Sequence, residues 1–409
     1  MTKQNLSTDK NVWMVVIVAA LGYFVDIYDL VIFSIVRVQS FRDIGIPESD
    51  MRTDGEYVLN MQMAGLLLGG LLWGVLADRF GRIKVLFGSI LMYSLANIAN
   101  GFVNDIHSYA FIRLIAGIGL AGELGAGITL VSESMQKSKR GYGTMVVASV
   151  GVLGAVAAYY VSELFSWRNA YFAGGAMGLL LLVLRVGTFE SAMFKGVAHK
   201  QVARGSLRML FADSARFKRY MYCLLIGLPI WFVVGILVTQ APEFGNLLGA
   251  PVTLSAGKGI LFTYLGLSLG DVLAGLLAQL TKSRRLAVFL FQLLIIATAV
   301  WYLSSEGITE QQFHRIAFFM GIAIGYWATF VTIASEQFGT NLRGTVTTTA
   351  PNFVRGALIP STLLFEFFVR QFNLITAAYL MIFLLTGVAV FALYKLKESF
   401  DRDLNFEER

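Results

Sequence analysis

The sequence of 409 residues contains only six prolines, three histidines and a single cysteine, Cys223. One cysteine excludes an internal disulfide and any metal site built from several cysteines. The histidines, His107, His199 and His314, are too scattered along the chain to predict a metal cluster. Because prolines are few and no Pro/Ser-rich or low-complexity stretch occurs, a disordered tail or a long linker is not expected.

Charged residues are also scarce: they make up 14% of the chain, whereas hydrophobic residues make up 56%. Such a chain cannot bury its apolar side chains in one soluble core, so a lipid bilayer is its expected solvent. The sequence contains no Walker loop, no dinucleotide-binding fingerprint and no Ser-His-Asp arrangement that its few histidines could support. We therefore expect no enzyme activity, no cofactor and no bound metal.

A short pattern, Ser-Glu followed after six residues by Arg-Gly, occurs at Ser132 and again at Ser335, 203 positions later. A second echo, at a shift of 201 positions, relates Gly65, Gly69, Gly74 and Ala77 to Gly266, Gly270, Gly275 and Ala278. Both repeats lie in strongly apolar sequence. The chain is therefore predicted to be a duplicated half, which is typical of membrane transporters whose substrate path lies between two related bundles.

Twelve hydrophobic stretches are long enough to cross a bilayer, which takes about 20 residues of helix. They lie near residues 12–36, 58–77, 83–102, 108–132, 143–163, 170–188, 219–240, 253–280, 285–304, 311–335, 345–369 and 372–395. Helices are expected because lipid cannot hydrogen-bond open backbone groups. The predicted fold is an all-α membrane protein with twelve transmembrane helices in two pseudo-symmetric six-helix bundles.

The two bundles are predicted to be joined by a cytoplasmic connection. Residues 1–188 form the expected N-terminal six-helix bundle, and residues 219–409 form the C-terminal six-helix bundle with a short cytoplasmic tail. Residues 189–218, which are basic and partly amphipathic, are interpreted as the linker, with a short interfacial helix. The alternative for this segment is a regulatory or partner-binding role.

Lysine and arginine are distributed unevenly between the two sides of the predicted spans. With both termini in the cytoplasm, that side carries most of these residues, against Arg37, Arg42, Arg52, Arg168 and Arg370 on the opposite side. The positive-inside rule then predicts cytoplasmic termini. The net charge of +7 needs no nucleic-acid partner. The polar start of the chain is interpreted as the flank of an uncleaved signal-anchor helix.

The loop after the second predicted span combines glycines with charged residues: Gly74, Asp78, Arg79, Gly81 and Arg82. This Gly-x-x-x-Asp-Arg-x-Gly-Arg-x-Lys pattern resembles the hallmark loop of the major facilitator superfamily. The resemblance implies that the acid and the arginines form a breakable latch at the cytoplasmic gate. The alternative, a basic loop that only obeys the topology rule, explains the arginines but not the glycines and the acid together.

The repeated Ser-Glu-x6-Arg-Gly pattern narrows the branch of that superfamily. It resembles the sugar porters and their relatives, the metabolite:proton symporters and the organic-ion and synaptic-vesicle-glycoprotein-like transporters. The resemblance implies that Glu133 and Arg140, and likewise Glu336 and Arg343, bridge to the loops after the second and eighth spans. Such bridges would close the cytoplasmic gate while the outside is open.

Charges inside the predicted spans predict a proton path, because function is the default explanation for such costly residues. Asp26 and Asp29 are three residues apart and share one helical face, in an element that resembles the first span of the aromatic-acid:proton symporters. A desolvated acid can exchange protons near neutral pH. Arg113 in the fourth span is the preferred partner of Asp26 or Asp29; Glu123 could serve as the acid instead, or could tie the fourth helix to the gate. The alternative for the acids is structural pairing with an arginine.

Arg355 lies near the middle of the eleventh span, in a stretch that resembles the one in organic-anion and aromatic-acid carriers where an arginine faces the cavity. Its planar cation is suited to hold a carboxylate. The alternative is an ion pair with Asp271. Residues at similar depth that could complete the pocket are Gln62, Tyr159, Trp231, Tyr264, Tyr326, Trp327 and Asn352. Taken singly, the aromatic residues could equally face lipid or serve packing.

These features together predict a proton-coupled importer of a small organic anion, with substrate, proton and lipid bilayer as its partners. The resemblance to the superfamily implies a monomer. The short connection at residues 37–57 departs from the animal organic-ion carriers and favours a bacterial inner-membrane protein. Alternatives are a sugar or polyol porter, a facilitator without proton coupling and an exporter. A membrane receptor that retains the same fold without transporting is a further alternative.

Overall fold

A computed structural model describes residues 3–80, 82–122, 140–192, 207–400 and 408, and within them the chain is almost entirely helical, without β-strands. The first half contains α1 (Lys3–Asp43), α2 (Met51–Phe80), α3 (Arg82–Asn100), α4 (Ile106–Leu120), α6 (Arg140–Leu164) and α7 (Trp167–Ala192). The second half contains α8 (Leu207–Ala212), α9 (Ser214–Leu225), α10 (Leu228–Phe232), η1 (Val233–Val238), α11 (Ala241–Leu247), α12 (Ala256–Thr281), α13 (Arg284–Leu303), α14 (Glu310–Ile324), α15 (Trp327–Glu336), α16 (Thr340–Gly356), α17 (Leu358–Gln371) and α18 (Leu374–Lys395).

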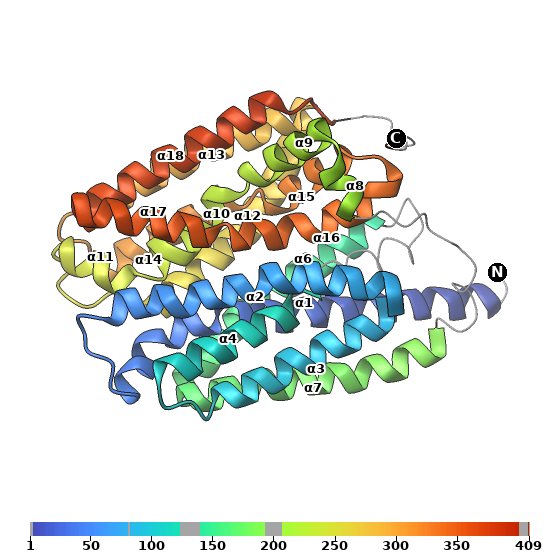
Figure 1. The fold of residues 1–409 in the computed structure, drawn as a ribbon, viewed down its shortest axis with the longest axis horizontal. Helices are drawn as coiled ribbons and strands as arrows, with labels where there is room; N and C mark the ends of the chain where they lie inside the picture. The colour runs from blue at the N-terminus through green and yellow to red at the C-terminus, as the bar shows by residue number, and fades with distance from the viewer. Residues whose placement is uncertain (1–2, 81, 123–139, 193–206, 401–407, 409) are drawn as a thin grey trace.

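The expected spans are present as helices. In the described residues, eight helical segments are long and apolar enough to cross a membrane, and three shorter apolar helices lie within α3, α4 and α6. Together with the 30-residue helix α2, they account for the twelve predicted spans, so the predicted fold class is confirmed. Helix α1 begins and α18 ends at the same end of the molecule, at the right of Figure 1. We call this the terminal end and the opposite one the distal end.

Glycines bring helices of each bundle into the same close contact. A Cβ atom added at Gly65 of α2 would lie 2.1 Å from the backbone oxygen of Leu114 in α4. In the second half, a Cβ added at Gly266 of α12 would lie 2.0 Å from the backbone oxygen of Phe318 in α14. Both distances are impossible for a larger residue, so the glycine echo in the sequence marks one helix crossing that is built twice.

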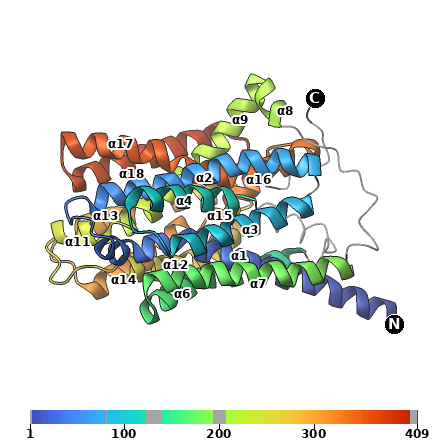
Figure 2. The same ribbon diagram turned by 60° about the horizontal axis from the view of Figure 1, so that its bottom comes forward.

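The two bundles meet along two pairs of helices. Helix α2 lies along α16 and α17, and α12 packs against α1 and α6 (Figure 2). Helix α7 continues to Ala192 and α9 begins at Ser214. Residues 193–206 of the expected linker lie outside the described residues, so the boundaries at 188 and 218 stay a prediction.

Three spans of the second half are interrupted between their ends. The seventh is divided into α9, α10 and the π-helical segment η1, and Pro229 stands at the start of α10. The tenth is divided at Gly325 and Tyr326 between α14 and α15, and the eleventh at Ala357 between α16 and α17. Interrupted helices leave backbone groups and side chains available at the middle of a membrane protein, where transporters place their substrate sites.

Candidate functional site

Arg355 and two tryptophans come together where the three interrupted spans break. Arg355 is in the last turn of α16, Trp231 is in the short helix α10, and Trp327 is the first residue of α15. The guanidinium carbon of Arg355 lies 5.5 Å from the ring centroid of Trp231 and 5.6 Å from that of Trp327. The two indole rings meet edge to face, with centroids 6.3 Å apart. The cation therefore rests on two aromatic faces.

The charge of Arg355 is not neutralised by an ion pair anywhere in the described part of the chain. Its side chain is only 3% exposed, and its Nε atom is buried without a hydrogen-bond partner there. A buried guanidinium that retains an unused donor is costly unless a ligand supplies the missing acceptor. The arrangement is therefore suited to hold an anion.

The first bundle contributes Tyr23 and Asp26 to the surroundings of Arg355. Both lie on α1, one helical turn apart, and both interact electrostatically with the guanidinium, as does Tyr264 of α12. Asp26 is 4% exposed. The site thus combines a cation from one bundle with a carboxyl group from the other, so its electrostatics change when the bundles move apart.

Asp271, the alternative partner proposed for Arg355, has another role. Its Oδ1 atom accepts a hydrogen bond from the backbone N–H of Ala328, at 2.9 Å, and the N–H of Trp327 also points to this carboxylate. A carboxylate at a helix N-terminus is stabilised by these free N–H groups. Asp271 therefore holds the start of α15, and the ion pair with Arg355 is not formed.

Arg113 pairs with Asp29 rather than with Asp26. Its Nη1 atom donates to Asp29 Oδ1 at 2.9 Å and to Asn97 Oδ1 at 3.1 Å, and its Nη2 atom donates to the backbone oxygen of Asp29 at 2.9 Å. Both charged side chains are fully buried within the first bundle. Glu123, the other candidate partner, lies outside the described residues.

Four of the expected pocket residues are directed elsewhere. Tyr326 donates from its hydroxyl group to the backbone oxygen of Ile226 inside the second bundle, at 2.9 Å. Gln62 donates to the backbone oxygen of Leu30. Their depths were inferred from the sequence, but depth does not fix which way a side chain points around the helix axis. Both are therefore packing residues in this conformation.

The other two lie at the contact between the bundles. Asn352 donates from Nδ2 to the backbone oxygen of Ala121, at 3.1 Å, and so ties α16 to the end of α4. Tyr159 of α6 lies against Gly257 at the start of α12. Of the expected pocket residues, Arg355, Trp231, Trp327 and Tyr264 are thus the ones that come together, and Tyr23 was missed.

At the terminal end, Glu336 and Arg343 of the second copy of the repeated pattern make different contacts. Glu336 at the end of α15 accepts two hydrogen bonds from Arg284 at the start of α13, at 2.6 and 2.7 Å. Arg284 follows the short turn of Lys282 and Ser283 after the eighth span. Arg343 donates to the backbone oxygens of Ser335 and Phe338, at 3.2 and 3.3 Å, and thereby holds the turn between α15 and α16.

Glu398 strengthens the same corner from the chain end that follows α18. It accepts hydrogen bonds from the Ser283 hydroxyl and from backbone N–H groups of Arg284, Ser399 and Phe400. Burial opposes its ionisation, but these hydrogen bonds outweigh burial and lower the pKa of Glu398 below its usual value. Glu398 therefore stays ionised and caps α13.

The first copy of the gate is only partly described. Gly74, Asp78, Arg79, Arg82 and Arg140 belong to α2, α3 and α6, but the surroundings of Gly74 and the side chains of the other four are not described. Gly81 and Glu133 lie outside the described residues altogether. Their part in a latch therefore stays a prediction.

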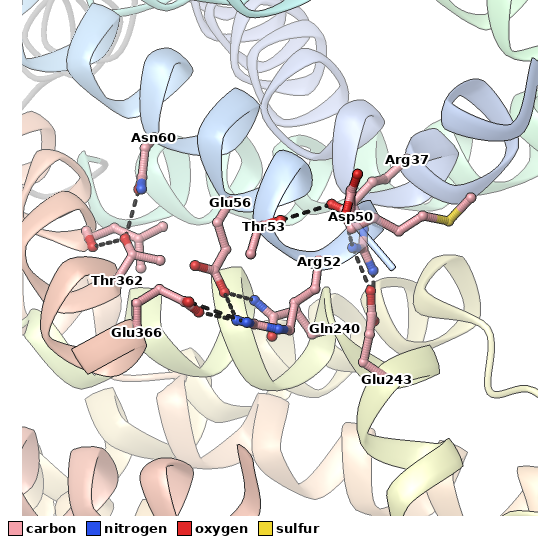
Figure 3. Close-up of polar contacts among 12 residues, drawn as sticks. Arg37, Asp50, Arg52, Thr53, Glu56, Asn60, Gln240, Glu243, Thr362 and Glu366 are labelled. Atoms are coloured by element: carbon pink, nitrogen blue, oxygen red, sulfur yellow. Dashed lines mark hydrogen bonds and ion pairs between the residues drawn. The ribbon is translucent and has the colours of Figure 1, made fainter. Parts of the chain in front are cut away.

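A network that the sequence did not reveal joins the bundles at the distal end (Figure 3). Arg52 of α2 donates to both carboxylate oxygens of Glu366 in α17 and to Glu56 Oε1, at 3.0 Å for the last. Gln240, between η1 and α11, donates to the same Glu56 oxygen at 2.6 Å. The Glu56 and Glu366 carboxylates thus both accept a hydrogen bond from Arg52 Nη1.

A second distal contact is made by Arg37 near the end of α1. It donates to Glu243 of α11 at 2.8 Å and to the backbone oxygen of Thr239 at 3.1 Å, and its side chain is 1% exposed. Gly55 of α2 leaves room for it, because a Cβ there would lie 2.7 Å from Arg37 Cδ. Thr362 and Asn60 add a hydrogen bond of 2.8 Å (Figure 3). These contacts close the distal end in this conformation.

Comparison with known proteins agrees with this architecture. The family model of the Major Facilitator Superfamily matches residues 19–359. NiaP of Bacillus subtilis, whose name refers to niacin and nicotinamide transport, is 25% identical over 85% of this chain and 87% of its own. The 3-(3-hydroxy-phenyl)propionate transporter of Escherichia coli is 29% identical over 58% of each chain. The benzoate transport protein of Acinetobacter baylyi is 24% identical over 65% of this chain and 64% of its own.

Proposed function

Since the chain belongs to the major facilitator superfamily, we propose that it imports a small aromatic carboxylate together with a proton by alternating access. Membership confirms the resemblance predicted from the sequence and makes the protein a multi-pass membrane transporter of a small molecule, and not an enzyme. The proposal includes cytoplasmic termini, a bacterial inner membrane and a monomeric carrier whose partners are substrate, proton and lipid.

The observation that carries the proposal is Arg355 with its two tryptophans. A buried guanidinium with an unused N–H donor calls for an acceptor, and a carboxylate matches its planar fork. Trp231 and Trp327 offer ring faces and edges beside the same cation. A flat aromatic ring that carries one carboxylate would use both features, whereas a sugar would leave the charge of Arg355 unmatched.

The relatives support the same class of substrate. Their names refer to benzoate, to 3-(3-hydroxy-phenyl)propionate and to niacin, and each of these compounds has an aromatic ring and a carboxylate. Niacin and nicotinamide share one ring and differ in the charge of a single group. That pair is therefore a direct probe for the part played by Arg355.

Asp26 supplies a physical reason for coupling to protons. Its carboxyl group and the carboxylate of a substrate would compete for the same cation, because both lie within electrostatic reach of Arg355. Substrate binds more easily when Asp26 has accepted a proton and lost its charge. Proton and substrate would then bind together and leave together, which is the behaviour of a symporter.

Uptake into proteoliposomes tests the proposal. The purified protein is reconstituted, and accumulation of radiolabelled benzoate and nicotinate is followed with an acidic exterior and with equal pH on both sides. We expect accumulation only with the inward proton gradient, and competition by aromatic carboxylates but not by benzamide or glucose. Gradient-driven uptake of glucose in place of the acids would contradict the proposed substrate class.

A further inference from the structure

We propose that Glu56 and Glu366 form a second proton-binding site, in which one shared proton holds the distal gate closed. This inference deepens the proposed function and rests on its proton coupling. The site lies at the bundle contact between α2 and α17 (Figure 3). Asp26 and Arg355 belong to other helices, α1 and α16. Nothing in the spacing of the sequence predicts it, because the two acids are 310 positions apart.

The first argument is a count of charges. Arg52 is the one cation that contacts these two carboxyl groups in the described residues, and it bonds to both. Glu56 is 6% exposed and Glu366 is 18% exposed, so water screens them poorly. Two ionised carboxylates that accept from the same guanidinium nitrogen repel strongly at such a site, and a shared proton removes that repulsion.

The neighbouring charged groups do not supply the missing positive charge. Arg37 from α1 is committed to Glu243 from α11, through a hydrogen bond to one carboxylate oxygen and an ion-pair contact of 2.7 Å with the other. On the other side of α2, Asp54 interacts with Asp50 and His107 at the rim. Arg370, one turn further along α17, is exposed. When both carboxyl groups are ionised, the group formed by Glu56, Glu366 and Arg52 therefore keeps an excess of negative charge.

The second argument comes from Gln240, an independent residue aimed into the cluster. It is 2% exposed, it donates to Glu56 at 2.6 Å, and its Oε1 atom is buried without a partner in the described residues. The oxygen and nitrogen of an amide occupy interchangeable positions. With the amide turned over, Oε1 would accept a hydrogen bond from a protonated Glu56. Gln240 is therefore able to serve both protonation states of the acid.

The direction of the effect follows from linkage. The closed gate brings Glu56 of one bundle to Glu366 of the other, so the closed state binds the shared proton more tightly than the open state does. Low pH then favours the closed gate, and a rise in pH opens it. This dependence on pH suits an importer, because a proton taken from the outside closes the gate behind the substrate.

Distance measurement between spin labels tests the inference without any substrate. Labels are attached to Ser49→Cys and Gln371→Cys, both exposed residues at the distal end, after the buried native thiol is removed by Cys223→Ala. We expect a short distance at about pH 5 and a growing population with a longer distance towards about pH 9. Glu56→Gln should keep the short distance at both pH values, because its neutral amide needs no proton.

Two further variants complete the experiment. Glu366→Gln should also abolish the pH dependence, and it serves as a second reading should Glu56→Gln fail to fold. Glu243→Gln is the matched control: it removes a carboxylate from the Arg37 contact, so it should lengthen the distance while the pH dependence persists. A wild-type distance that does not change with pH, or an unchanged pH dependence in Glu56→Gln and Glu366→Gln, overturns the proposal. Since no substrate is present, that failure would leave the transport of aromatic carboxylates untouched.

Discussion

Arg113 donates two hydrogen bonds of 2.9 Å to Asp29, one to the carboxylate and one to the backbone oxygen. Both side chains are fully buried, and Asn97 supplies a further acceptor. In contrast, Asp26 lies one turn earlier on α1 and interacts electrostatically with Arg355 of the second bundle. The two acids of the first span therefore differ in environment although they share one helical face.

The first prediction is that Asp29 serves stability. Asp29→Ala leaves the buried guanidinium of Arg113 without its counter-charge, which should lower the free energy of unfolding by about 3–5 kcal/mol. Thermal unfolding of the purified protein measures this, and the double variant Asp29→Ala with Arg113→Gln should recover part of the loss. An Asp29→Ala protein as stable as the wild type would show that the pair is not structural.

The second prediction is that Asp26 carries the coupled proton. Asp26→Asn has a permanently neutral side chain, so it should abolish gradient-driven accumulation of benzoate and still allow exchange of benzoate across the membrane. Proteoliposomes preloaded with unlabelled benzoate separate the two activities. Accumulation at the wild-type level in Asp26→Asn would exclude this residue as the proton carrier.

The third prediction concerns the tryptophans that flank Arg355. Trp231→Leu and Trp327→Leu should each weaken the binding of benzoate by about 3- to 30-fold, which corresponds to about 0.5–2 kcal/mol for the loss of an aromatic face beside a buried cation. Trp231→Phe and Trp327→Phe should lose less. Trp301→Leu is the control, because Trp301 is on α13 and its side chain is exposed. Equal effects at all three positions would point to general loss of structure.

The fourth prediction concerns the corner at the terminal end. Glu336 and Arg284 form two short hydrogen bonds, and both side chains are mostly buried. A double-mutant cycle with Glu336→Gln and Arg284→Gln should give a coupling energy of about 1–2 kcal/mol in the free energy of unfolding. Glu336→Gln should also raise the access of a cysteine label from the terminal end. A coupling energy near zero would mean that the ion pair does not stabilise the folded protein.

The fold could be predicted well from the sequence because each helix that crosses lipid needs a long, continuous apolar stretch. Long apolar stretches and repeated glycines report directly on helices and on their closest crossings, as at Gly65 and Gly266. The contact between Glu336 and Arg284 joins two segments that the family resemblance had placed at one end of the bundle.

The sequence predicted the site less completely, for geometric reasons. Residue depth follows from counting along a helix, but rotation around its axis does not, so Tyr326 was expected in the pocket and instead lies inside the second bundle. The distal network joins Arg52 to Glu366 across the two bundles. A single sequence gives no signal for such a contact, and Arg37 and Arg52 were interpreted only as charges that follow the topology rule.

The central claim is that Arg355 holds the carboxylate of the substrate, and calorimetric binding of benzoate and benzamide tests it most directly. Wild-type protein should bind benzoate and hardly bind benzamide, and Arg355→Ala should weaken the binding of benzoate by about 2–5 kcal/mol. Arg355→Lys should lie between them, because its ammonium lacks the planar fork. Arg370→Ala, which removes an exposed arginine, should have no effect. Unchanged affinity for benzoate in Arg355→Ala would contradict the account.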